Sequence, residues 1–129
     1  MALPAVERGE AWHWTLRLRE SPHGLVGGIS LRAGDRDNRG FWIGLPWQGR
    51  GLATEACASV TAFWFGTLGF PALRVAKATA NETSRRISIR EGMRLVRTVE
   101  RDFVSGRLPA EEWEITAAEW RARASARGP

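Results

Sequence analysis

The segment of this 129-residue chain best suited to bind a reactive ligand, judged by its residue types and their spacing, is a glycine-rich loop. It reads Gln48-Gly49-Arg50-Gly51-Leu52-Ala53-Thr54 and opens a stretch of helical periodicity. A turn at a helix N-terminus leaves several backbone N–H groups without partners, and the helix dipole adds partial positive charge. Gly49 and Gly51 let a ligand approach the backbone, and Arg50 adds a guanidinium fork suited to phosphate oxygens. The loop therefore predicts a pyrophosphate site.

Hydrophobic alternation predicts two strands at the start of the chain. Residues 11–19 alternate as a half-buried strand, whose apolar face carries Trp12, Trp14, Leu16 and Leu18. A turn is expected at residues 21–24, followed by a second strand over 25–31. Gly27 and Gly28 within this strand indicate a bulge or a close approach of another backbone.

The glycine-rich loop is expected to join a third strand, 41–45, to an amphipathic helix that begins at Leu52 and ends near residues 66–69. A strand at 72–80 follows. A strand–helix–strand unit of this length makes a right-handed crossover, so residues 41–45 and 73–79 should lie parallel and adjacent.

The last part of the chain is predicted to hold two further helices and a hairpin. A short helix begins after Asn81 and stops at Gly92. Residues 95–104 and 108–115 form the hairpin, around a turn at 105–107. Thr116 with Glu119 makes a capping box for the last helix.

Two motifs at coupled spacing resemble the GNAT superfamily of N-acetyltransferases. Residues 48–53 match its Gln/Arg-x-x-Gly-x-Gly/Ala motif, and residues 51–56 are similar to the Gly-x-Ala-Thr-Glu-Ala of its ribosomal-protein alanine/serine (RimJ/RimL-like) branch. Residues 81–84, followed by Gly92, resemble the family's Asn-x-x-Ser segment. A lone Gly-x-Gly pair would more often be an ordinary strand-to-helix turn, and the second motif raises the functional interpretation above it.

The resemblance implies an α+β fold and a cofactor, acetyl-CoA. The fold would be a mixed, mostly antiparallel twisted sheet flanked by helices, with a central parallel strand pair splayed around the cofactor, in one domain over residues 1–129. The residues implied to hold acetyl-CoA are Leu45, Gln48, Gly49, Arg50, Gly51, Leu52, Ala53, Thr54, Asn81 and Ser84. The implied oxyanion donor is a backbone N–H of residues 42–45, for which we take Ile43, and Ser84 would protonate the leaving thiolate. Read without the family, Asn81 and Ser84 are good helix-capping residues.

The sequence departs from the family in its general base. Many relatives carry a glutamate just before the glycine and aromatic residue that open the third predicted strand, where this chain has Asn38-Arg39. Substitutes on nearby loops are Asp35, Asp37 and His23, whereas Glu55 is more often structural in the family. Water acting on a partly deprotonated amine is the remaining route.

Two further departures concern the short helix and the start of the chain. Ser88 and Glu91 stand where the family is usually apolar, and Arg85, Arg86 and Arg90 either hold outer phosphates of the cofactor or form a solvated basic face. Relatives begin with a strand and two helices that this chain lacks, so we expect a short protein, a fragment or a chain completed by a partner. The missing strand would expose the face of Trp12, Trp14 and Leu16, which suggests a homodimer.

Composition excludes some classes of protein. Cys57 is the only cysteine, so an intrachain disulfide and a cysteine-based zinc site are excluded, and no metal is expected. No apolar stretch is long enough for a membrane span or a signal peptide, which favours the cytoplasm. The net charge of +5 rests on eighteen arginines and a single lysine, Lys77. A nucleic-acid binder is one interpretation; scattered arginines from a GC-rich bacterial genome are the favoured one.

Three functions therefore stay open at this point. The first is an acetyltransferase that acts on a primary amine, either a protein N-terminus or a small molecule. The second is a GNAT relic or subunit that binds acetyl-CoA without chemistry, which the absent base favours. The third is a small basic nucleic-acid module, for which the sequence shows no continuous arginine surface.

Overall fold

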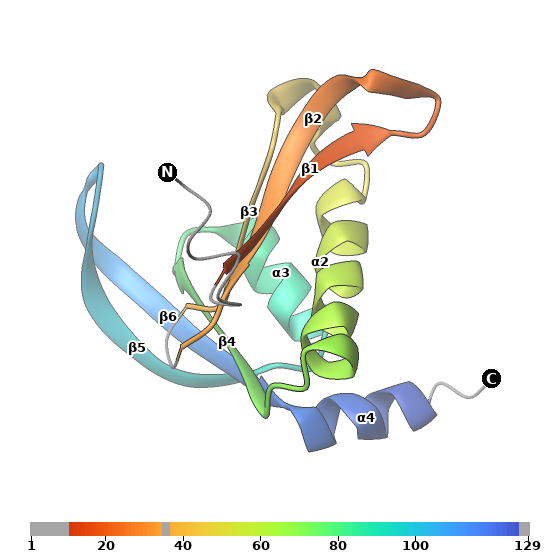
Figure 1. Ribbon diagram of the computed structural model, residues 1–129. Helices are drawn as coiled ribbons and strands as arrows, with labels where there is room; N and C mark the ends of the chain where they lie inside the picture. The colour runs from red at the N-terminus through yellow and green to blue at the C-terminus, as the bar shows by residue number, and fades with distance from the viewer. Residues whose placement is uncertain (1–10, 35–36, 127–129) are drawn as a thin grey trace.

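Two three-stranded antiparallel sheets frame the molecule in the computed structural model, which describes residues 11–34 and 37–126 (Figure 1). The first sheet has the order β1-β2-β3, with the bounds Ala11–Leu18, Ser21–Arg32 and Arg39–Ile43. The second has the order β4-β6-β5, with the bounds Ala72–Ala78, Gly106–Thr116 and Arg94–Phe103. The α-helices are α2, α3 and α4, with the bounds Leu52–Ala62, Glu82–Arg90 and Ala117–Ala126. This mixed α+β arrangement confirms the predicted fold class.

The inner face of β1 is the predicted one. Its side chains alternate between partly buried and exposed from Trp12 to Leu18. The rings of Trp12 and Trp14 meet Phe70 and Phe63 edge-on, at centroid distances of 6.2 and 5.5 Å. The face that the sequence suggested would need a partner subunit therefore packs within the chain, against Phe63 of the helical segment that α2 begins and Phe70 of the loop that follows it.

The predicted turn at residues 21–24 is wrong by two residues. The chain reverses at Arg19 and Glu20, and β2 already begins at Ser21. Leu18 pairs with Ser21 while Arg17 pairs with Leu25, so residues 22–24 form an irregularity within β2. Turn-forming residue types mark a break in regular pairing, and here the break is a bulge instead of the chain reversal.

The close approach predicted at Gly27 and Gly28 is confirmed. A Cβ atom at Gly28 would lie 2.7 Å from Nε1 of Trp42, and one at Gly27 would overlap the carbonyl oxygen of the same tryptophan. Both glycines pair with β3, Gly27 with Ile43 and Gly28 with Trp42. They let the end of β3, where the candidate site begins, lie close against β2.

The helix after the loop follows the predicted stripe. It begins at Leu52 and continues beyond Ala62 as a π-helical turn, Phe63–Thr67. Cys57, Val60 and Trp64 are buried in the hydrophobic core, together with residues of β2, β4, β6 and α3. Burial of such side chains from every layer holds both sheets against this helix.

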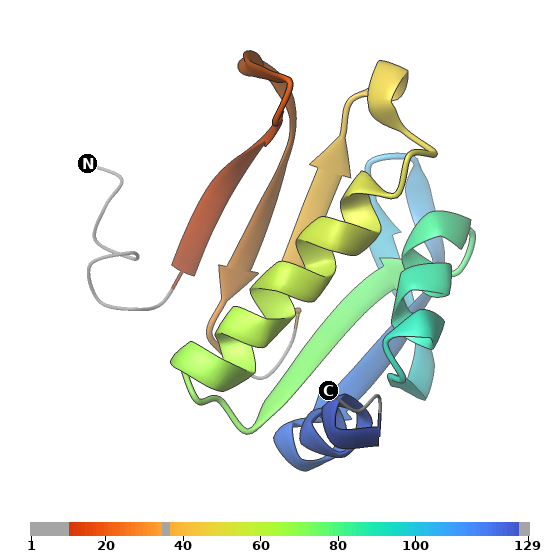
Figure 2. The same cartoon turned by 90° about the vertical axis from the view of Figure 1, so that its right-hand side faces the viewer.

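β3 and β4 run in the same direction and diverge, as Figure 2 shows. They belong to separate sheets, and the contact between them is made just before β3 begins. Asn38 donates from its backbone N–H to the carbonyl of Arg74 at 2.7 Å, and its Oδ1 accepts from the Arg74 N–H at 2.8 Å. The predicted parallel pair is therefore adjacent at one end and splayed at the other.

Asn38 is 1% exposed and uses its whole amide group. Its Nδ2 donates to the carbonyls of Arg32 and Gly34, both at 2.9 Å. An asparagine whose donors and acceptor are all paired joins the two sheets at the closed end of the splay.

The C-terminal elements match their predictions closely. The β5–β6 hairpin reverses at residues 104 and 105, one residue earlier than expected. The backbone N–H of Thr116 donates to Glu119 at 2.9 Å, and the Glu119 N–H donates to Oγ1 of Thr116 at 3.1 Å. This reciprocal pair is the predicted capping box of α4. Within the described part of the chain, no helix has the length and apolar character needed to cross a bilayer.

Candidate active site

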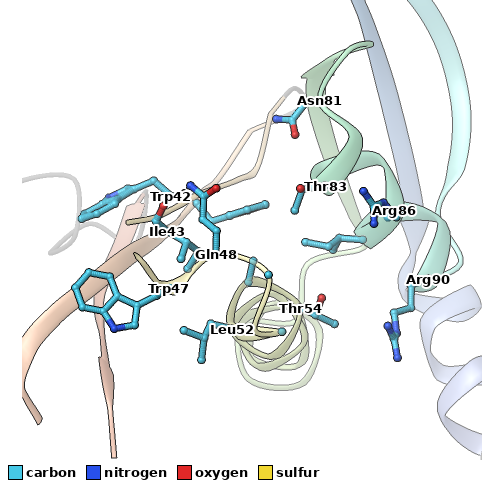
Figure 3. Close-up of a pocket in the computed structure, with 15 residues that line it drawn as sticks. Trp42, Ile43, Trp47, Gln48, Leu52, Thr54, Asn81, Thr83, Arg86 and Arg90 are labelled. Carbon is cyan, nitrogen blue, oxygen red and sulfur yellow. Dashed lines mark hydrogen bonds between the residues drawn. The ribbon is translucent and has the colours of Figure 1, made fainter. Parts of the chain in front are cut away.

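A cleft of about 530 Å³ opens between the end of β3, the first turn of α2 and one face of α3 (Figure 3). In Figure 3, Leu52 and Thr54 come from α2 on one side, and Thr83, Arg86 and Arg90 come from α3 on the other. The residues that line it are Phe41, Trp42, Ile43, Trp47, Gln48, Gly49, Gly51, Leu52, Ala53, Thr54, Asn81, Thr83, Arg86, Ile87 and Arg90. The two sequence motifs, about thirty residues apart, thus meet across one space.

The glycine-rich loop presents unpaired backbone donors to this cleft. Gly49 and Gly51 have φ angles of 78° and 77°, in the left-handed region that glycine adopts most readily. A helical backbone bond runs from the Glu55 N–H to the Gly51 carbonyl at 3.1 Å, and no side chain caps α2. The amides of residues 52–54 therefore precede the helical ladder, and the positive end of the helix dipole lies at the cleft.

At Ile43, the backbone groups of β3 point to the unpaired side of the strand. Gly44 donates to the Val26 carbonyl at 2.8 Å, and antiparallel pairing alternates, so the N–H and C=O of Ile43 point away from β2. Gln48 Nε2 donates to the Ile43 carbonyl at 2.9 Å. The loop is thereby tied to the end of β3, and the Ile43 N–H is directed to the open side of the strand.

Asn81 has the capping role that its type suggests, and it also lines the cleft. Its Oδ1 accepts a 3.2 Å hydrogen bond from the backbone N–H of Ser84 at the start of α3. The two interpretations of Asn81 are compatible, because the cap uses its oxygen and leaves its Nδ2 donors available.

Three of the expected cofactor residues lie outside the lining of the cleft. Leu45 is 81% exposed on the short 3-10 turn Leu45–Trp47, and Arg50 is exposed within the loop. Ser84 is half-buried on α3, where its carbonyl accepts from Lys77 Nζ at 2.8 Å. The remaining expected residues, together with Ile43, line the cleft.

Sequence reasoning did not single out Phe41, Thr83 and Ile87, which also line the cleft. The periodicity of strands and helices could have predicted their positions in the cleft. Phe41 lies two residues before Ile43 on the same strand and so on the same face. Thr83 and Ile87 lie four residues apart on α3 and so share one helical face.

The electrostatic character of the cleft is positive. Arg86 and Arg90 line it, and none of the described residues that line it carries a carboxylate. Together with the amides of α2, the two guanidinium groups give the space the charge that an anionic ligand needs.

Buried polar pairs behind α3 account for the unusual Ser88 and Glu91. Ser88 is fully buried and its hydroxyl accepts a hydrogen bond from Lys77, which is 5% exposed. Arg39, also 5% exposed, donates to Glu91 at 3.0 Å and to Thr61 at 2.7 Å. Each polar residue at a position where the resemblance implied an apolar one thus faces a buried cation from another element.

Burial shifts two titrating groups in this region. It lowers the pKa of Lys77 to about 8, with the neighbouring Arg39 acting in the same direction. It raises the pKa of the Cys57 thiol to about 11, and this thiol lies fully buried in the core.

The candidate general bases are distant or not described. Asp37 lies six residues before Ile43, which is about 20 Å along an extended strand. Its Oδ1 accepts from the Ala76 N–H at 3.2 Å, and burial raises its pKa. Asp35 and the side chain of His23 lie outside the described residues. Glu55 is exposed on the first turn of α2 and is absent from the cleft lining.

A glycine-rich loop at a helix N-terminus, an open strand edge and a splayed strand pair thus surround one cleft. The sequence matches the profile of the family described as "Acetyltransferase (GNAT) domain" across residues 1–94. The chain belongs to this family.

One curated protein resembles the chain at the level of sequence. The Bacillus subtilis protein "Putative ribosomal N-acetyltransferase YdaF" is 31% identical over 104 residues, which cover 70% of this chain and 56% of that protein. This chain therefore spans little more than half the length of that relative.

Solved structures share the fold at low identity. A RimL ribosomal alpha-N-protein acetyltransferase in complex with coenzyme A superposes with a TM-score of 0.75 at 13% identity, covering 87% of this chain and 65% of the other. A spermidine N-acetyltransferase SpeG variant of Vibrio cholerae gives a TM-score of 0.80 at 16% identity, covering 94% and 74%. These likenesses support the fold.

Proposed function

We propose that this chain is an N-acetyltransferase that moves an acetyl group from acetyl-CoA to a primary amine, either a protein N-terminus or a small molecule. One observation carries the proposal. The unpaired amides of the first turn of α2, the arginines of α3 and the open edge of β3 at Ile43 face a single cleft without a lining carboxylate. A ligand suited to it is anionic at one end and amide-rich along its length.

The residues of the cleft fit the parts of acetyl-CoA. The pyrophosphate would be held by the backbone of residues 49–54 and by the side chain of Arg50, which is exposed on the same loop outside the lining. The pantetheine amides would follow the edge of β3, with Asn81 opposite. A Cβ atom added at Gly49 or Gly51 would meet no heavy atom within 4 Å, so space for a ligand lies beside both residues. When bound, acetyl-CoA supplies an activated acetyl thioester.

The protein groups proposed for the chemistry are few. The Ile43 N–H is directed to the open side of β3 and would donate to a carbonyl oxygen as negative charge develops on it. The Ser84 hydroxyl, half-buried on α3 beside the lining residue Thr83 and itself outside the lining, would give a proton to the leaving thiolate. Because no described carboxylate lines the cleft, solvent is proposed to take the proton of the amine, and positioning supplies much of the rate.

A second function is favoured by the same lack of a base. A chain that binds acetyl-CoA without chemistry, as a relic or as a subunit, needs the loop and Asn81 but no group to deprotonate an amine. The position of Asp37, about 20 Å along the chain from Ile43, supports this alternative.

Two measurements separate these functions. A thermal-shift titration with acetyl-CoA should raise the melting temperature, because a ligand that binds only the native state stabilises it. Release of free thiol from acetyl-CoA in the presence of primary amines and N-terminal peptides should then identify an acceptor. Stabilisation without thiol release would favour the binding-only function, and no stabilisation would overturn both.

The proposal extends to the organisation of the protein. We propose that residues 1–129 form one GNAT domain that works in the cytoplasm as a homodimer, formed through a surface other than the Trp12 and Trp14 face, which packs within the chain. The solution mass should be twice that of the 14.3 kDa chain. Light scattering after gel filtration measures it, and a stable monomer at 0.1 mM would exclude the dimer.

A further inference from the structure

The arginines of α3 are not used alike. Arg85 forms ion pairs with Glu111 at 2.9 Å and with Glu82 at 3.6 Å. Arg86 and Arg90 have exposed side chains that make no ion pair or hydrogen bond with any described residue, and both line the cleft. Arg85 is thus held by ion pairs within the protein, whereas the two guanidinium groups on the cleft side of the helix are free to bind a ligand.

The free pair has a geometry that suits one compact anion. Residues four apart on a helix lie on the same face with neighbouring side chains. Figure 3 shows Arg86 and Arg90 following one another along α3, on the side of the cleft opposite Thr54. Two like charges at this spacing destabilise an isolated helix, so the pair brings no gain to the helix itself.

The loop on the opposite wall already accounts for the pyrophosphate. Its donors are backbone amides at the start of α2, which suit two linked, singly charged phosphates. Coenzyme A carries a third phosphate, the 3′-phosphomonoester of its ribose, and a monoester has a charge of about −1.5 to −2 at pH 7. Guanidinium groups are the side chains best matched to such a dianion.

We infer that Arg86 and Arg90 form a second anion site that binds the 3′-phosphate of the cofactor and selects coenzyme A over its 3′-dephospho form. This inference rests on the proposed function, because it assigns one part of the same ligand. Arg50, on the loop, is left to the pyrophosphate.

The test compares two ligands that differ in one group. Isothermal titration of the wild-type protein should give a dissociation constant for coenzyme A about tenfold lower than that for 3′-dephospho-coenzyme A. The variant R86Q/R90Q should bind coenzyme A about tenfold more weakly and should bind the dephospho form within threefold of wild type. Affinity for the dephospho form serves as the control that the variant is folded.

A matched variant removes two positive charges elsewhere. R19Q/R121Q changes exposed arginines that do not line the cleft, so it should preserve the tenfold preference for coenzyme A. An equal loss for both ligands in R86Q/R90Q, or an unchanged preference, would overturn the second anion site while leaving the proposed function standing. Wild-type protein that binds neither compound would overturn the proposed function and this inference together.

Discussion

The ammonium group of Lys77 on β4 donates a 2.8 Å hydrogen bond to the carbonyl oxygen of Ser84 on α3. The same group donates to the hydroxyl of Ser88 one turn further on, and it lies 5.7 Å from the centroid of the Trp113 ring. A single lysine, the only one in the chain, thus fixes the first turns of the helix whose other face lines the cleft.

Lys77 should give the protein an unusual rise of stability with pH. Burial lowers its pKa from 10.5 to about 8, so between these values the folded state binds fewer protons than the unfolded state. Stability then rises with pH, by about 1 kcal/mol between pH 8 and 9. From about pH 8 upward the raised pKa of Cys57 works in the opposite sense, because the folded thiol keeps its proton while the unfolded thiol, with its ordinary pKa of 9.0, loses it; between pH 8 and 9 this offsets about a third of the rise. Urea unfolding at pH 7.5, 8.5 and 9 measures the slope.

The matched variant for this measurement is Lys77→Met, which keeps an unbranched side chain of similar length. Its unfolding free energy should lack the rise between pH 8 and 9. Because Ser88 can donate to the carbonyl of Ser84 four residues earlier, the variant should stay folded. A wild-type curve that is flat or falling over this interval contradicts the assignment.

Gly51 should be needed for its backbone conformation. Gly51 has a φ angle of 77°, and a Cβ atom added to it would meet no heavy atom within 4 Å. The cost of Gly51→Ala is therefore the strain of placing a non-glycine residue in the left-handed region. We expect a loss of about 1 kcal/mol in unfolding free energy, with weaker binding of coenzyme A. Gly51→Asn is the control, because asparagine tolerates this region better. Equal stability of the alanine variant and wild type in urea would refute the prediction.

Gln48 should affect ligand binding more than stability. Its side chain is exposed, and its one hydrogen bond reaches the Ile43 carbonyl at 2.9 Å. Gln48→Met keeps the length of the side chain and loses the donor without adding a charge to the cleft, so the loop is released from β3. We expect less than 0.5 kcal/mol of change in unfolding free energy and a several-fold weaker affinity for coenzyme A by titration calorimetry. An unchanged affinity would show that the tie to Ile43 does not position the loop.

Asn38 should be among the most sensitive positions of the fold. Asn38→Ala removes a 1% exposed amide and leaves the Arg74 N–H and the carbonyls of Arg32 and Gly34 without it. Arg32 and Gly34 are exposed, so water can reach their carbonyls, whereas the Arg74 N–H loses its acceptor at the joint between the sheets. An unsatisfied buried group costs about 1–3 kcal/mol, so we expect a loss of about 2–3 kcal/mol. Asn81→Ala, which removes an exposed cap, should cost about 1 kcal/mol. Similar losses for the two variants in chemical denaturation would contradict this ranking.

Local patterns predicted the parts of the molecule that depend on neighbouring residues. The alternation around Trp12 and Trp14, the glycines at 49 and 51 and the capping box of Thr116 are all short-range signals, and each has its expected structure. The cleft could be predicted for the same reason, because each motif lies at the end of a strand that its own sequence defines.

Pairings between distant elements could not be read from the sequence. Arg39 and Glu91 are 52 residues apart, and neither position shows a partner until β3 and α3 are packed together. Ser88 looked like a departure from an apolar helix face because its partner, Lys77, lies on another element. Periodicity reports which face a residue occupies and gives no information about which buried group it meets there.

The joint at Asn38 has a mechanical consequence. Among the described residues, the hydrogen bonds that link the two sheets directly are made by Asp37 and Asn38, at one end of the diverging strands. Because β3 and β4 are joined at this end, a small rotation of one strand about the joint changes the distance between their other ends by a larger amount. These other ends are Ile43 on β3 and the start of α3 after β4. The width of the ligand cleft therefore depends on the geometry at Asn38, at the opposite end of the strands.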